Sequence, residues 1–101
     1  MKIYKFTAIF TPEKGTKDVY NVSVPALPGC LTFGESLVEA KYNIRDAMEL
    51  YLENMLDDGE TIPKDKKTRA PKNALTEEVV VGVDYEVKTG FDNFKTELQY
   101  A

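Results

Sequence analysis

The segment from Tyr20 to Pro63 constrains the folding of this 101-residue chain more than any other part. It contains, in order, an alternating strand, a Pro-Ala-Leu-Pro-Gly-Cys turn, a short strand, an amphipathic helix and a Gly-Glu-Thr-Ile-Pro stop. Pro25 and Pro28 cannot donate a backbone hydrogen bond to a sheet, so the strand before them must end there or lie at an edge. Gly29 permits a backbone turn that other residues resist. The segment therefore predicts a turn and a helix with well-marked boundaries.

A long amphipathic helix is predicted over residues 36–58. Ser36 begins it, because Ser-Leu-Val-Glu is a capping box in which the Ser36 hydroxyl accepts from the Glu39 amide and the Glu39 carboxylate reaches back to the Ser36 amide. Gly59 fits just past the helix end, and Pro63 prevents the helix from resuming. The apolar stripe follows spacings of three and four through Leu37, Ala40, Ile44, Ala47, Met48, Tyr51 and Met55, and Val38, Leu52 and Leu56 widen it.

Period-2 alternation predicts strands over residues 2–10, 19–24 and 78–88, with a short additional strand over residues 30–33. The order of elements is therefore β-β-β-α-β. The predicted fold class is α+β, in which an antiparallel sheet carries one long helix on one face. One face of the last strand carries Val79, Val81, Val83, Tyr85 and Val87.

The chain is expected to divide into a core domain over residues 1–88 and a tail over residues 89–101. A sheet with a long valine-rich strand has edges that need cover. A homodimer or higher oligomer is therefore expected, assembled through Val79–Val87 or through Phe91 and Phe94 in the tail.

Candidate catalytic residues are scarce. The chain has no histidine and one cysteine, so Cys30 lacks the usual base partner and is interpreted as a buried structural thiol. Asp18, Asp84 and Glu86 are carboxylates of the kind that a two-metal nuclease uses, but a solvated strand face is the preferred interpretation. Neither an enzyme nor a bound metal or cofactor is expected. A single cysteine and the lack of an apolar run of about 20 residues predict a cytoplasmic protein.

Charge is unevenly distributed along the chain. The net charge is −4, and residues 64–73 hold five basic residues and one acid, a local +4 that leaves −8 for the rest. An acidic body suits a basic protein partner and argues against specific DNA binding. The basic segment is interpreted as a solvated loop, with weak phosphate contact as the alternative.

The motifs together resemble the HicB-like antitoxin family. The matching positions are Pro25, Leu27, Pro28, Gly29, Cys30, Thr32, Gly34, Glu39, Ala40, Gly59, Ile62 and Pro63. Ala26 stands where the family usually has Asp. The resemblance implies a fold related to a truncated RNase H and a role in sequestering a HicA-type toxin, a small basic ribonuclease. Many members carry a further DNA-binding domain, for which the 13 residues after Lys88 are too few.

The expected function is steric inhibition of such a toxin by a protein-binding module. The residues expected to contribute to partner binding are the acids of the helix and its end: Glu49, Glu53, Asp57, Asp58 and Glu60. The alternative is an orphan module without a toxin, serving as a homo-oligomeric structural or regulatory protein. A neighbouring gene for a small basic protein with a catalytic histidine distinguishes the two.

Overall fold

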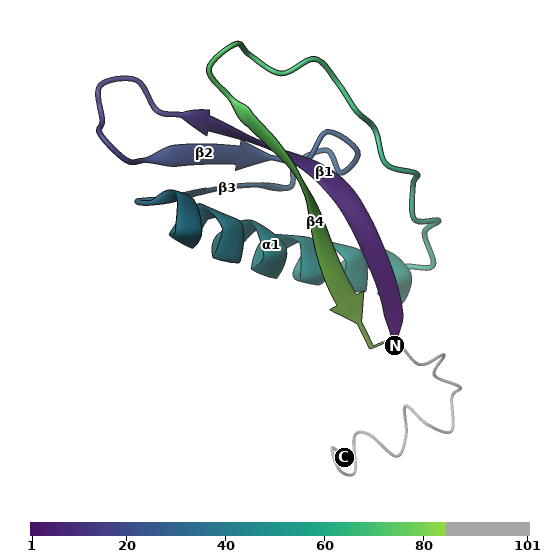
Figure 1. The fold of residues 1–101 in the computed structure, drawn as a ribbon. Helices are drawn as coiled ribbons and strands as arrows, with labels where there is room; N and C mark the ends of the chain where they lie inside the picture. Colours follow the sequence, from purple (N-terminus) through teal and green to yellow (C-terminus); the bar gives the residue numbers. More distant parts are fainter. Residues whose placement is uncertain (85–101) are drawn as a thin grey trace, which may run out of the picture.

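The computed structural model describes residues 1–84, and the fold there is a four-stranded sheet with one helix (Figure 1). The elements are β1 (Lys2–Pro12), β2 (Tyr20–Ser23), β3 (Leu31–Gly34), α1 (Leu37–Asp57) and β4 (Leu75–Val83). The strands lie in the order β3-β2-β1-β4, and all neighbours are antiparallel. The predicted α+β class and the β-β-β-α-β order are confirmed.

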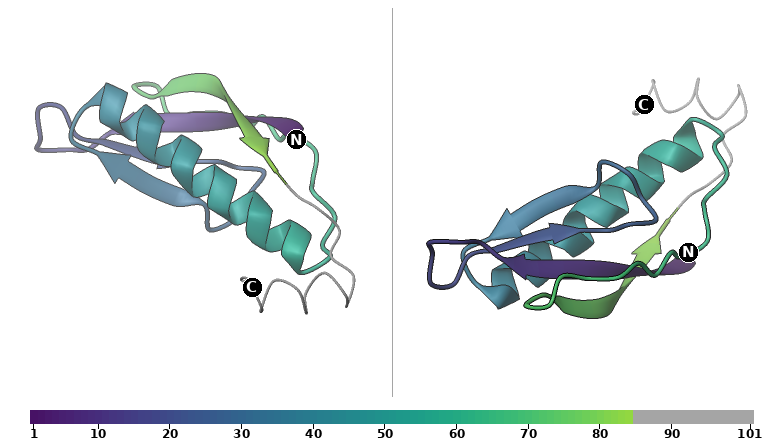
Figure 2. Two further views of the ribbon diagram at one scale, coloured as in Figure 1. Left: turned by 90° about the horizontal axis from the view of Figure 1, so that it is seen from below. Right: turned by 90° about the horizontal axis from the view of Figure 1, so that it is seen from above.

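The helix lies along one face of the sheet and buries the core there (Figure 2). Alternation in β1 directs Phe6, Ala8 and Phe10 toward α1, and all three are buried. Their neighbours in the register are buried as well: Phe6 lies opposite Val79, and Phe10 opposite Val22. The helix contributes Ala40, Ile44, Met48 and Leu52 at intervals of four residues. The core is therefore a layer of side chains between β1, its neighbours and one stripe of α1.

The turn between β2 and β3 is held by its own backbone. The amide of Leu27 donates to the Val24 carbonyl, and the amide of Cys30 donates to the Leu27 carbonyl, both at 2.9 Å. Gly29 has φ +85°, a conformation that residues with a Cβ rarely adopt. Leu27 and Cys30 are turned into the core. The Pro-Ala-Leu-Pro-Gly-Cys sequence therefore folds as a compact turn that adds two core side chains.

Gly34 is required by close packing between the end of β3 and the start of α1. A Cβ on Gly34 would lie 2.6 Å from the Ala40 Cα and within overlap distance of the Ala40 backbone nitrogen. Ala40 is itself fully buried. The Gly34–Ala40 pair thus lets the helix begin directly against the sheet.

The helix cap follows the prediction at Ser36 and departs from it at Glu39. The Ser36 hydroxyl accepts from the Glu39 amide at 3.0 Å, as predicted. The Glu39 carboxylate, however, accepts from the Glu35 amide at 2.6 Å and not from Ser36. At the other end, Gly59 has φ +74° and donates its amide to the Leu56 carbonyl, as expected of a residue just past a helix.

Two other predictions need correction. Val38 does not widen the apolar stripe, because its side chain is 78% exposed on the far side of the helix. The last strand begins at Leu75, three residues earlier than predicted, and is described as far as Val83. The predicted roles of Tyr85, Glu86, Val87, Phe91, Phe94 and the 89–101 tail lie outside the described residues.

The basic segment after α1 is anchored to the sheet. It returns along β1 from the end of the helix to the start of β4 (Figure 2, right). The carboxylate of Asp65 accepts from the Thr7 amide at 2.8 Å and from the Thr7 hydroxyl at 2.6 Å. Thr7 and Ile9, on the face of β1 away from the helix, are both buried. The segment is exposed, as predicted, but it is fixed at Asp65 and covers part of the outer face.

Candidate partner-binding surface

The exposed face of α1 carries a group of acids around one exposed leucine. Asp46, Glu49, Leu50 and Glu53 line a shallow hollow of about 280 Å³. Leu50 is 59% exposed, although the four helix positions buried in the core lie on the opposite side. Asp46 and Glu53 lie four and three residues from Leu50, which makes them its neighbours on the helix surface, and Glu49 directly precedes Leu50 in the sequence. The result is an apolar side chain with a negatively charged rim.

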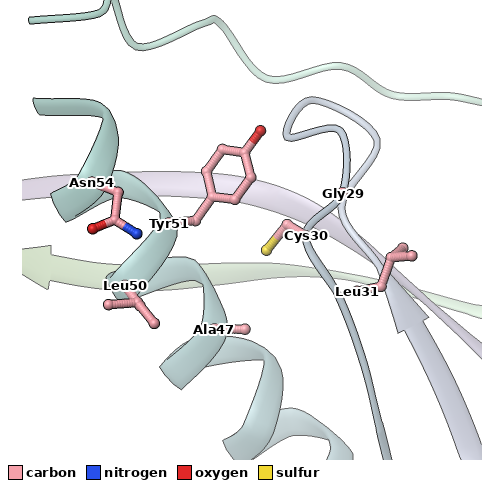
Figure 3. Close-up of a pocket in the computed structure, with 7 residues that line it drawn as sticks. All are labelled: Gly29, Cys30, Leu31, Ala47, Leu50, Tyr51 and Asn54. Carbon is pink, nitrogen blue, oxygen red and sulfur yellow. The ribbon is translucent and has the colours of Figure 1, made fainter. Parts of the chain in front are cut away.

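A second hollow lies on the other side of Leu50, between α1 and the β2–β3 turn (Figure 3). Gly29, Cys30 and Leu31 form one wall, and the other is lined by Ala47, Leu50, Tyr51 and Asn54 from the helix. Its volume is about 190 Å³. The Tyr51 hydroxyl donates to the Pro28 carbonyl at 2.7 Å, which fixes the ring across the top of the wall.

Leu50 belongs to both hollows, and they form one continuous surface. Leu31, on the sheet side, is 67% exposed. We call the set Leu31, Asp46, Ala47, Glu49, Leu50, Tyr51 and Glu53 the α1 surface. It combines apolar side chains that can be desolvated with carboxylates that repel an acidic protein and attract a basic one.

Cys30, the one cysteine of the chain, lines the hollow between α1 and the β2–β3 turn. Burial raises the pKa of the Cys30 thiol, which keeps it protonated and poorly nucleophilic. The hollow beside it is smaller than the roughly 300–1,000 Å³ of typical small-molecule sites. Among residues 1–84, no three acidic, cysteine or histidine side chains are grouped so as to hold a metal ion.

The structure places the five predicted partner-binding acids in two groups. Glu49 and Glu53 lie on the α1 surface. Asp57, Asp58 and Glu60 lie at the end of the helix, where all three are exposed and Asp58 is the C-cap residue. The first group lies on the exposed face of α1, and the second lies at its C-terminal end. Only the first group adjoins an exposed apolar residue, Leu50.

Sequence reasoning missed Asp46, Leu50 and Leu31. Leu50 gave a signal, because it is a large apolar residue outside the three- and four-residue spacing of the stripe. Leu31 gave no such signal in the sequence. It lies in a four-residue edge strand, and the register of that strand with β2 decides which of its side chains face solvent.

Comparison with known protein families identifies the chain. The family described as the HicB-like antitoxin of bacterial toxin–antitoxin systems matches residues 8–89. The chain belongs to the HicB-like antitoxin family. Two relatives of this HicB-like protein are the UPF0150 protein Ta0767 of Thermoplasma acidophilum and the UPF0150 protein ssr1765 of Synechocystis. The first is 44% identical over 60% of this chain and 86% of its own length, and the second 32% identical over 73% and 91%.

Solved structures show the same fold at low sequence identity. The Burkholderia pseudomallei antitoxin HicB aligns with a TM-score of 0.64 and 22% identity, over 95% of this chain and 82% of that one. A chain of the toxin–antitoxin complex from Streptococcus pneumoniae aligns with a TM-score of 0.68 and 12% identity, over 99% and 90%. The N-terminal domain of the Burkholderia HicB aligns over 81% of this chain and all of its own length, with a TM-score of 0.58 and 24% identity.

The described part of this HicB-like chain contains no helix long and apolar enough to cross a membrane. The sole helix there, α1, has a fully buried stripe and an exposed face rich in carboxylates. Its amphipathic character is explained by packing on the sheet.

Proposed function

We propose that this protein is an antitoxin module that binds a small basic ribonuclease toxin of the HicA type and inhibits it by steric cover. The proposal rests on the α1 surface of a HicB-like chain, where carboxylates surround the exposed Leu50 and the hollow beside it. A basic protein would be drawn to the carboxylates and anchored by insertion of an apolar side chain beside Leu50. The module needs no chemistry of its own to occlude an active site.

The apolar and the acidic residues of the α1 surface are proposed to have different roles, because covering them removes different kinds of group from water. Leu31 and Leu50 are exposed in the free chain, so covering them removes apolar area from water at about 25 cal/mol per Å². The carboxylates contribute less to the net affinity for the toxin, because each loses hydration when it is buried, but they raise the rate at which the two proteins meet. They are Asp46, Glu49 and Glu53. Leu50 is therefore proposed as the anchor and the acids as steering groups.

The acids at the end of α1 form a second group of proposed contacts. Asp57, Asp58 and Glu60 stand where the helix dipole gives no benefit to negative charge, since the C-terminus of a helix is itself negative. A basic partner that extends past Glu53 along the helix would offset the repulsion among these negative charges. These three residues are proposed to broaden the electrostatic attraction.

The test begins with a search of the neighbouring genes for one that encodes a small basic protein with a catalytic histidine. That gene is then co-expressed with this chain, and rescue of growth is scored. The wild-type chain is expected to rescue. Leu50→Asp is expected to fail while remaining folded, because its side chain is mostly solvent-exposed and outside the core. Val38→Asp is the matched control: Val38 is exposed on the same helix, near its other end, and outside the α1 surface.

Two results would contradict the proposal. If the wild-type chain neither binds nor rescues, the orphan-module alternative replaces the antitoxin function. If Leu50→Asp rescues as well as Val38→Asp, toxin binding uses a different surface.

A further inference from the structure

The basic segment, residues 64–73, crosses the outer face of the sheet, which is the face away from α1 (Figure 2, right). It carries a net charge of +4, and all of its cationic side chains are exposed. Within residues 1–84, no salt bridge joins any of them to an acid. The cations are Lys64, Lys66, Lys67, Arg69 and Lys72. The segment therefore presents positive charge to solvent over the sheet.

The segment is fixed to the sheet near its start. The Asp65 carboxylate accepts from the amide and the hydroxyl of Thr7, and also from the Lys66 amide at 2.8 Å. Thr7 is only 3% exposed, so this anchor belongs to the packed part of β1. Before β4, the Ala74 amide donates to the Pro71 carbonyl at 3.0 Å. Cations on a backbone that is already fixed lose less conformational entropy when they bind an anion than cations on a free loop.

An aromatic ring is exposed on the same face of the sheet. Phe33 pairs with Asn21 in the register, and Asn21 pairs with Thr11, so the three side chains lie on one face. Thr11 shares this face with Thr7, four residues earlier in β1, because strand side chains alternate. Phe33 is 56% exposed, and its backbone carbonyl is held by the Asn43 amide at 2.9 Å. The ring is thus an exposed flat surface on a fixed strand.

A hollow of about 310 Å³ lies in the same part of the sheet. Ser23 and Asn21 bring a hydroxyl and an amide to it, and Leu31 adds an exposed apolar side chain. β3 is two strands from β1, about 10 Å at the usual spacing of strands. The positive charge, the ring and the hollow are therefore within the reach of a few nucleotides. The full lining is Thr11, Asn21, Val22, Ser23, Leu31 and Thr32.

We propose that this outer face binds single-stranded nucleic acid without sequence specificity, with phosphates on the basic segment and bases against Phe33 and the hollow. Lysine and arginine attract the phosphate backbone, and unpaired bases stack on aromatic side chains. A duplex keeps its bases stacked on each other, so it could not use the ring of Phe33. An anionic membrane would also attract the cations, but it would bury Asn21 and Ser23 without hydrogen-bond partners, which costs free energy.

The net charge of −4 does not prevent this binding, because the acids of α1 lie on the other side of the sheet (Figure 2, left). A helix is about 10–12 Å across, more than the Debye length of about 8 Å at physiological ionic strength. Two acids adjoin the outer face itself. Glu78 pairs with Thr7 in the register, and Glu13 accepts from the Asn21 amide at 3.2 Å. Glu78 therefore lies beside the anchored segment and should oppose binding.

The first experiment measures fluorescence anisotropy of a labelled oligouridylate of about 16 nucleotides with the full chain alone. The wild type is expected to bind at about 50 mM salt and to weaken steeply by about 200 mM. Lys66→Gln with Arg69→Gln should flatten the slope of log affinity against log salt by about 1.4, or about 0.7 for each lost cation. Glu78→Gln should tighten binding. Lys41→Gln with Arg45→Gln, on α1, makes the same change in net charge and should leave the slope unchanged.

The second experiment tests the contact with bases. Phe33→Ala should weaken binding of the oligouridylate by about 5- to 150-fold, the range for one stacked base, and leave the salt slope unchanged. The variant should fold, because the ring is exposed and Asn43 binds only the backbone of Phe33. Tyr42→Ala is the matched control, since it removes an exposed ring from α1. Annealing the strand to its oligoadenylate complement should weaken binding and abolish the effect of Phe33→Ala.

The proposal is overturned if the wild type does not bind the oligouridylate at low salt, or if the two double variants change the slope equally. It also fails if Phe33→Ala binds like the wild type, or if the duplex binds as tightly as the single strand. Capture by phosphatidylserine vesicles without binding to the oligouridylate would assign the face to membranes instead. The toxin is absent from every measurement, so these results are independent of the proposed antitoxin function.

Discussion

At the scale of single residues, Gly34 is the position with least freedom to change. A methyl group there would overlap the backbone of Ala40, which cannot move without shifting the start of α1. We expect Gly34→Ala to lower the free energy of unfolding by about 1–3 kcal/mol, the usual range for overpacking. Urea unfolding measures the effect. Gly82→Ala is the control: its new methyl group would meet the flexible end of Met1 and should cost little. Equal losses in both variants would refute this explanation.

Asp65 is the residue whose effect depends on pH. Burial by itself would raise the pKa of this carboxyl, but hydrogen bonds from the Thr7 hydroxyl, the Thr7 amide and the Lys66 amide, with the charge of Lys67, outweigh it and lower the pKa. A lowered folded-state pKa stabilises the fold above the unfolded value of about 3.9 and loses that contribution as pH falls through the folded value.

Asp65→Asn is therefore expected to destabilise the protein at pH 7 by about 0.5–1.5 kcal/mol, the range for an ordinary hydrogen bond, because Asp65 is exposed and solvent screens its charge. The difference from the wild type should shrink as pH falls below about 4, because the wild-type carboxyl is then protonated as well. Thermal unfolding across pH measures it. A difference that is constant from pH 7 to pH 3 would show that the charge of Asp65 contributes nothing.

At the scale of elements, three parts of α1 should contribute differently to stability: the N-cap at Ser36, the buried stripe and the exposed face. Ser36→Ala removes the hydroxyl that accepts from Glu39 and is expected to cost about 1 kcal/mol. Met48→Ala empties a fully buried position and is expected to cost about 2–5 kcal/mol. Val38→Ala, at an exposed position, should change stability little. Chemical denaturation orders the three, and a loss at Val38 as large as at Met48 would contradict the assignment of faces.

The order and type of the elements were predictable because the determinants are local. Ser36, Gly59 and the prolines mark boundaries, and alternation marks strands. The contacts between distant segments were not predictable. Asp65 lies 58 residues from Thr7, and nothing near it in sequence indicates a partner in β1. Exposure of Leu31 likewise depends on how β3 pairs with β2, so Leu31 appeared only in the structure. Leu50 could have been found from its place outside the apolar stripe of the helix, and the acids Glu49 and Glu53 were predicted.

At the scale of the whole molecule, charge is divided between two surfaces. Helix α1 carries carboxylates on its exposed face, and the segment along the other side of the sheet carries Lys64, Lys66, Lys67, Arg69 and Lys72, all exposed. The one acid in that segment, Asp65, is bonded to Thr7. Opposite charges thus lie on different sides of the sheet, so a basic partner is attracted to the helix and repelled from the segment.

If this protein binds a basic toxin as proposed, we expect the asymmetry to make that association sensitive to salt. The association rate of the wild type should fall as salt rises, because screening weakens attraction beyond the Debye length of about 8 Å at physiological ionic strength. Replacing Glu49 and Glu53 by Lys should slow association at low salt and flatten or reverse the salt dependence. Glu13→Lys with Asp18→Lys makes the same change in net charge on the β1–β2 loop, away from the α1 surface. Stopped-flow rates for the three proteins decide the matter: if both double variants lose the salt dependence equally, net charge alone steers the toxin and the placement of Glu49 and Glu53 on α1 is irrelevant.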